Sequence, residues 1–204
     1  MNPTEYEKNV LITESNDFSA IKGRIDDRMI RLLHAGLGLS SELAELTDAY
    51  ASPKNVNIDW VNIAEESADL LWYCAVAINA LGFNHDEVSS LESEASEPLV
   101  QKHSTLCLKA ALLAAVCATG EYNDLLKKHL FYGRELNVEK MKRVLQALCL
   151  AVSRLCFISG TTIGEARQTN INKLKARYGE KFTEAAALNR DLETERKILE
   201  DGVK

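Results

Sequence analysis

The sequence predicts an all-α protein that folds as a helical bundle. Only three prolines and ten glycines interrupt its 204 residues, so long helices are permitted. Apolar residues recur at steps of three, four and seven in several stretches, which is the spacing of one helix face. No stretch shows the apolar and polar alternation of a β-strand. Together these observations favour helices packed on helices.

The chain begins with a polar lead-in, residues 1–20, which predicts at most a short helix. Residues 25–50 then predict a long helix. Its apolar stripe consists of Leu32, Leu39, Leu43, Leu46 and Tyr50. Pro53 ends this helix, because its ring cannot continue the helical hydrogen bonding.

The next helix is predicted from Asp59, a capping residue, to Leu81, where Gly82 stops it. Its second half is apolar nearly all round, which indicates burial on several sides. Asp86 can cap a further helix.

Helical periodicity resumes over residues 106–130 and again over 138–158, where Gly160 ends it. A last clear helix begins near Ile163 and continues past Arg177. The tail, residues 185–204, is polar and helix-prone, with few anchors.

The two halves of the chain resemble each other. Residues 42–46 align with 121–125 at an offset of 79, and residues 69–82 align with 147–160 at an offset of 78. Helix order, loop lengths and glycine stops agree, which favours a tandem duplication. The alternative is that any two helical hairpins look alike.

Composition excludes some classes of function. The net charge is −6 and no basic cluster is present, so binding to duplex nucleic acid is not expected. The N-terminus has no apolar signal core, and the most apolar run, residues 106–119, is too short to span a bilayer. No cysteine belongs to a C-x-x-C pair, so we expect reduced core cysteines in a cytoplasmic, soluble protein. These are Cys74, Cys107, Cys117, Cys149 and Cys156.

Four acidic residues are the strongest candidates for a site. Glu42 and Glu45 are three apart on one predicted helix, and Glu66 and Asp69 are three apart on the next. Residues at this spacing lie on one face. Four such carboxylates on adjacent helices suit Mg²⁺ or Mn²⁺. The alternative is a surface salt-bridge network. Glu65 is a further candidate, but it points away from this face.

A second candidate lies near the end of the chain. Lys173 and Arg177 are four apart, with Asn170 one turn earlier, so they share a helical face that can hold a polyphosphate. The alternative is a solvated basic face. Tyr178 can pack in the core or against a base. Trp72 can stack on a nucleobase or belong to the core.

At these residues the chain resembles the MazG-like all-α nucleoside triphosphate pyrophosphohydrolases. The carrying motifs are E-x-x-E at Glu42, then E-x-x-D opening Asp-Leu-Leu-Trp-Tyr, and later Asn-x-x-Lys-Leu-x-x-Arg-Tyr followed by Phe182. The segment His34-Ala-Gly-Leu-Gly-Leu is similar too. The resemblance covers residues 25–182, and the joint pattern is more specific than any single motif.

The resemblance implies a reaction and roles. Mg²⁺ held by the four acids would bind a (deoxy)nucleoside triphosphate and activate a water, which attacks the α-phosphorus to give a monophosphate and pyrophosphate. The basic residues of the last motif would bind the phosphates. Trp72 and Tyr178 are candidates for contact with the base.

The chain departs from the family pattern in a way that suggests division of labour. Residues 1–97 carry the acids, but Glu92 stands where the asparagine is expected. Residues 98–204 carry the basic motif, but Val144 and Ala147 replace E-x-x-D. We therefore expect two MazG-like units in tandem that form an intrachain pseudo-dimer, one structural domain with a composite site.

Two other functions stay open. One is a dUTPase-like pyrophosphatase with the same metal chemistry. The other is a catalytically degenerate helical module that binds a nucleotide or a protein. Family members usually work as dimers or tetramers, so the remaining apolar faces leave room for a homodimer.

Overall fold

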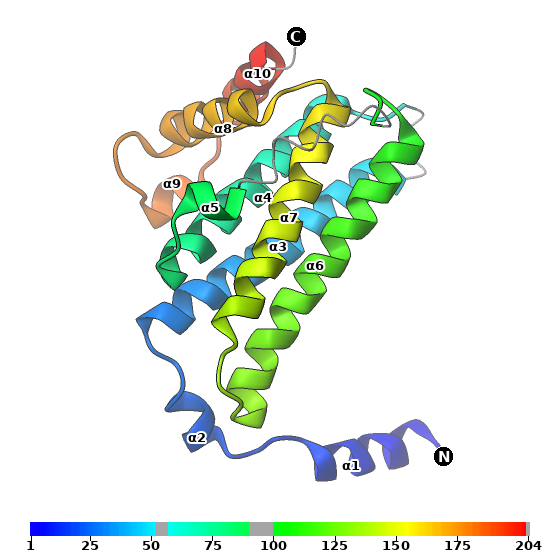
Figure 1. Ribbon diagram of the computed structural model, residues 1–204, viewed down its shortest axis with the longest axis vertical. Helices are drawn as coiled ribbons and strands as arrows, with labels where there is room; N and C mark the ends of the chain where they lie inside the picture. Colours follow the sequence, from blue (N-terminus) through cyan, green and yellow to red (C-terminus); the bar gives the residue numbers. More distant parts are fainter. Residues whose placement is uncertain (52–56, 90–99, 203–204) are drawn as a thin grey trace.

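The computed structural model describes residues 1–51, 57–89 and 100–202, whose course is shown in Figure 1. Within these ranges the chain is helical without strands, and 80% of it is helix. The predicted all-α class is therefore confirmed. Pro53 and Glu92 lie outside the described residues.

Four long helices lie side by side and form the bundle (Figure 1). They are α3 (Asp27–Ala51), α4 (Trp60–Leu81), α6 (Thr105–Tyr132) and α7 (Val138–Ser159). Helix α3 packs against α4, and α6 packs against α7. The two hairpins meet because α4 also contacts α7, and α3 contacts α6. Buried apolar side chains from all four helices merge into one hydrophobic core.

The ends of these helices follow from local sequence. The carboxylate of Asp59 accepts hydrogen bonds from the backbone N–H groups of Val61 and Asn62, which caps α4 as predicted. Gly82 ends α4 in the left-handed conformation, with φ of 74°. One cap differs from the prediction: Asn84 caps α5 (His85–Val88), whereas Asp86 lies within its first turn.

The helices outside the bundle connect its two halves. Helix α5 contacts α4 and also α7. Helix α8 (Ile163–Tyr178) bends by 88° from α7 and crosses α4. Each hairpin is therefore followed by a helix that contacts the other hairpin. Helices α9 (Glu184–Leu188) and α10 (Leu192–Gly202) pack against α8.

The tail is better anchored than its polar sequence predicts. Glu195 and Leu199 of α10 are buried, and the guanidinium of Arg196 donates hydrogen bonds to Asp59 beside the start of α4. The expectation of few anchors is wrong, because the tail is also anchored by polar contacts of Glu195 and Arg196, which leave no apolar stripe in the sequence.

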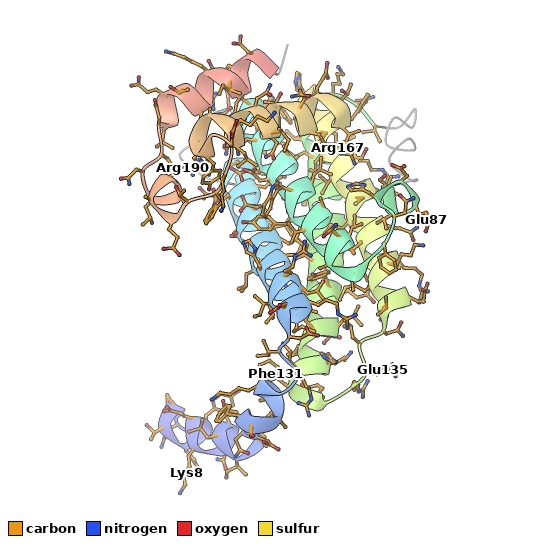
Figure 2. All side chains as sticks on the ribbon, turned by 90° about the vertical axis from the view of Figure 1, so that its left-hand side faces the viewer. Lys8, Glu87, Phe131, Glu135, Arg167 and Arg190 are labelled. Carbon is orange, nitrogen blue, oxygen red and sulfur yellow. The ribbon has the colours of Figure 1, made fainter. Side chains whose placement is uncertain are left out.

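The N-terminal residues form α1 (Pro3–Thr13) and α2 (Phe18–Lys22), more helix than the lead-in predicted. Helix α1 has no buried residue and lies apart from the bundle; Lys8 marks its position in Figure 2. Hydrogen bonds to carbonyls near the end of α6 hold the segment after it: Ser15 donates to Phe131 and Arg24 donates to Leu130.

The cysteines and the apolar helix α6 bear on two expectations from composition. Cys74, Cys149 and Cys156 are buried as predicted, but Cys107 is half-buried and Cys117 is exposed. By length and composition α6 could cross a membrane, a property that core helices of soluble proteins share. The absence of a membrane segment therefore stays a prediction from the sequence.

Candidate metal and phosphate site

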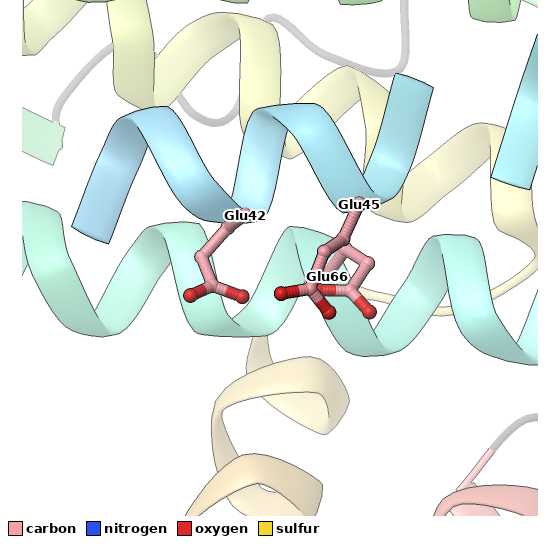
Figure 3. A group of neighbouring side chains, drawn as sticks. All are labelled: Glu42, Glu45 and Glu66. Atoms are coloured by element: carbon pink, nitrogen blue, oxygen red, sulfur yellow. The ribbon is translucent and has the colours of Figure 1, made fainter. Parts of the chain in front are cut away.

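Three carboxylates gather beside the α3–α4 contact. Glu42 and Glu45 lie one turn apart on α3, and Glu66 lies on α4. One oxygen from each side chain lies within 4.8 Å of the other two. Figure 3 shows the three side chains reaching toward the same side of this helix pair. The structure thus brings three of the four predicted acids into one cluster.

The cluster is electrostatically costly. Burial is the largest cause that raises the pKa of Glu66, to about 9, and a hydrogen bond with Glu42 and the charges of Glu45, Glu65 and Asp69 add to it. Burial also raises the pKa of Glu42 and outweighs the opposing effect of the hydrogen bond with Glu66. At neutral pH the metal-free pair therefore holds a proton between two carboxyl groups.

This donor set fits a hard divalent cation. Carboxylate oxygens are the ligands that Mg²⁺ and Mn²⁺ prefer, and Mg²⁺ usually needs only a few of them because it keeps several waters. A cation would replace the shared proton and offset the repulsion among the acids. Glu42, Glu45 and Glu66 are the residues that would hold it.

Asp69, the fourth predicted acid, lines the same pocket but has partners of its own. Its Oδ1 accepts a hydrogen bond from Asn170 Nδ2 at 2.5 Å, and its Oδ2 lies 2.5 Å from Lys173 Nζ. The Lys173 ammonium also lies 3.1 Å from Glu65 Oε1. These contacts hold α8 against α4, although the residues involved are more than a hundred positions apart in the sequence. Glu65, expected to point away from the acids, lines the same pocket.

Asn170 and Lys173, predicted to take part in phosphate binding, lie beneath the pocket surface in the structure. They are 3% and 1% exposed and lie behind Asp69 rather than on the pocket surface. Burial alone would lower the pKa of Lys173, but the charges of Asp69 and Glu65 together with the hydrogen bonds to them outweigh burial and raise the pKa. Lys173 is therefore a buried ammonium that holds two carboxylates in place.

Arg177 does face the pocket, and the C-terminal helix holds it. Its Nε and Nη2 donate to the two carboxylate oxygens of Glu195 at 2.8 and 2.5 Å. Arg190 donates to the same carboxylate and also lines the pocket. Burial alone would raise the pKa of Glu195, but the hydrogen bonds from the two arginines and their positive charges together outweigh burial and lower the pKa.

The pocket has a volume of about 540 Å³ and combines acids, arginines and aromatic rings. Trp72 lies edge-on to His34 and Tyr73, with ring centroids 5.9 and 5.0 Å away. Tyr178 lies 5.2 Å from Phe182. All five rings line the pocket, which includes both predicted base contacts, Trp72 and Tyr178.

A glycine shapes one side of this pocket. A Cβ atom at Gly38 would overlap the ring of Tyr73, so only glycine lets this ring lie against α3 one turn before Glu42. Burial, followed by the charges of Glu42 and Asp69, raises the pKa of Tyr73, which keeps its hydroxyl protonated.

The corresponding acids of the second half form no such cluster. Glu121 lies 2.7 Å from Lys140, and Asp124 pairs with Lys127 and Lys128. Val144 and Ala147 stand where α4 has Glu66 and Asp69. The carboxylates of α6 therefore have lysine partners where those of α3 have other acids.

Sequence reasoning missed Arg190 and Glu195 entirely. Both lie in the polar tail, where no apolar period or short motif marks them. The one available indication was charge, because Glu195 is one of several acids following the basic helix that ends at Tyr178.

Comparison with protein-family models, with curated proteins and with solved structures finds no match to this chain.

Proposed function

We propose that this protein hydrolyses (deoxy)nucleoside triphosphates to a monophosphate and pyrophosphate in a Mg²⁺-dependent reaction. One observation carries the proposal: a single pocket holds Glu42, Glu45 and Glu66 within 4.8 Å of one another, together with two arginines and several aromatic rings. This combination matches the three parts of the substrate complex, which are cation, polyphosphate and base.

Each part of the pocket has a role in this proposal. The acids of α3 and α4 hold the cation, which when bound would supply positive charge to the phosphates and a more acidic water. Arg177 binds the phosphates. Trp72 and Tyr178 provide ring faces for the base, since every nucleobase can stack on an aromatic side chain. Asn170 and Lys173 act indirectly in this proposal, because they hold the carboxylate of Asp69 in position.

The proposal includes the tandem origin of the chain. Asp59 and Asn137 cap α4 and α7, Gly82 and Gly160 end them, and Asn84 and Thr162 cap the helices that follow. Each pair is separated by 78 residues. The reciprocal contacts of α5 with α7 and of α8 with α4 agree with a pseudo-dimer of two MazG-like units.

Release of pyrophosphate from a panel of nucleotides, with and without Mg²⁺, tests the function. We expect Mg²⁺-dependent release, and we expect Glu66→Gln or Arg177→Ala to abolish it while the helical circular dichroism spectrum is kept. Glu121→Gln is the matched control, because this acid pairs with Lys140 outside the pocket, and it should retain activity.

The outcome also separates the alternatives. Activity confined to dUTP would indicate a dUTPase-like enzyme. Nucleotide binding without pyrophosphate release would indicate a degenerate binding module. Full activity in the Arg177→Ala variant would remove the composite site from the proposal.

A further inference from the structure

We infer that α10 completes the phosphate-binding side of the pocket, with Arg190 as a second phosphate ligand and Glu195 as a positioning residue for Arg177 and Arg190. The inference rests on the proposed function and extends it to a segment that lies beyond Phe182, outside the family resemblance.

The contacts of Glu195 carry this inference. Its carboxylate accepts hydrogen bonds from Nε and Nη2 of Arg177, at 2.8 and 2.5 Å, and from Nε and Nη2 of Arg190, at 3.2 and 2.7 Å. The Glu195 side chain is 4% exposed, whereas that of Arg190 is 41% exposed. A buried carboxylate therefore fixes two guanidinium groups whose other parts reach the pocket.

The charge balance of the two arginines points to an anionic ligand, although Arg177 also forms a hydrogen bond with the side chain of Tyr178. A guanidinium carries five N–H donors in a rigid plane, and each arginine presents only its Nε and Nη2 edge to Glu195. The Nη1 group of each arginine stays outside this contact. Two positive charges against one negative charge leave an excess positive charge beside the acid cluster. A polyphosphate fits this arrangement, because its neighbouring anionic groups can be bound by two forks at once.

Anchoring of α10 alone does not explain this cluster. The helix has another buried anchor in Leu199 and a separate ion pair between Arg196 and Asp59. Burying the charge of Glu195 costs free energy even when it is paired, and a buried apolar residue would anchor the helix at lower cost. Arg190 lies in the short connection before α10, and its side chain is 41% exposed, so the hydrogen bonds to Glu195 hold its guanidinium at the pocket.

The test uses three variants of the full chain, Arg190→Gln, Glu195→Gln and Arg196→Gln. Binding of inorganic tripolyphosphate in the presence of Mg²⁺ is measured by calorimetry, and KM and kcat are measured for the best nucleotide found. Arg196→Gln is the matched control, because this arginine lies on α10 and pairs with Asp59 and Glu200 outside the pocket.

We expect Arg190→Gln and Glu195→Gln to weaken tripolyphosphate binding and raise KM by roughly 10-fold or more, the size typical of a lost hydrogen bond to a charged group. The value of kcat should change by less than about 3-fold, since neither residue lies with the acids. Arg190→Lys should restore part of the binding, and Arg196→Gln should bind like the unaltered protein.

Other outcomes overturn the inference. Unchanged tripolyphosphate binding in Arg190→Gln would overturn the inference. Because the Arg190 side chain is 41% exposed, we expect this variant to fold. Tighter binding in Glu195→Gln would show that Glu195 competes with phosphates rather than positioning their ligands. If no nucleotide is hydrolysed but tripolyphosphate binding depends on Arg190 and Glu195, the proposed function fails and the phosphate site stands.

Discussion

The carboxyl group of Glu66 is 5% exposed, and its pKa is raised to about 9. Without a bound cation, this buried group lowers the stability of the folded protein. Glu66 keeps its proton in the folded state, whereas an ordinary glutamate loses it near pH 4.5. Between these two values the folded state binds more protons than the unfolded state. The stability of the metal-free protein therefore falls as pH rises across this range.

Replacing Glu66 by glutamine should remove this penalty. The amide is uncharged at every pH, so we expect Glu66→Gln to raise the melting temperature in the presence of a chelator, by more at pH 8 than at pH 5. Added Mg²⁺ should raise the melting temperature of the unaltered protein but not that of the variant. An equal increase at both pH values would contradict the assignment. Glu121→Gln, at a half-exposed position, serves as the comparison.

The spacing of acids along the sequence predicted which carboxylates share a helix face, and the structure brings Glu42, Glu45 and Glu66 together. Spacing could not predict which basic residues pair with the acids of α4. The pairing of Lys173 with Asp69 and Glu65 depends on the angle at which α8 crosses α4, and no short motif encodes that angle. The sequence therefore could not show that Lys173 is buried and paired with these two carboxylates.

At the level of helices, caps and stops were the most predictable features. Asp59, Gly82 and Gly160 act as their residue types suggest, because N-cap carboxylates and left-handed glycines satisfy backbone groups locally. Elements held by long-range polar contacts were predicted poorly. Helix α10 is the clearest case, since its anchors are an ion-paired Glu195 and the Arg196–Asp59 pair.

Two glycines allow a matched test of this view. A Cβ atom added at Gly82 or at Gly120 would meet no atom within 4 Å, so space does not distinguish the two positions. Gly82 has φ of 74°, and Gly82→Ala should cost about 1 kcal/mol. Gly120 lies inside α6, and Gly120→Ala should add about 0.5 to 1 kcal/mol. Urea unfolding measures both values. Changes of the same sign would contradict the argument.

Across the whole molecule, the two helical hairpins share one core rather than packing as independent units. Helices α4 and α7 pack together, and the core includes side chains from all four long helices. Helix α8 adds a second connection, because it follows the second hairpin in sequence but contacts the first in space. Neither half therefore has a complete core by itself.

We expect thermal unfolding to be a single cooperative transition, because separating the halves would expose the α4–α7 interface. Scanning calorimetry should give equal calorimetric and van't Hoff enthalpies. Residues 1–97 and 98–204, expressed separately, should each show less helix by circular dichroism than they contribute to the intact chain. Two resolved transitions, each matched by one isolated half, would show that the halves fold independently.

The long separation between Asp69 and its partners has a consequence during synthesis. Asn170 and Lys173 follow Asp69 by 101 and 104 residues. At a translation rate of about 5 to 20 residues per second, Asp69 is made roughly 5 to 20 s before Lys173. During that interval Asp69 and Glu65 have no cation partner from α8. We therefore expect the α4–α8 contact, and with it this side of the pocket, to form only after the second half of the chain has been made.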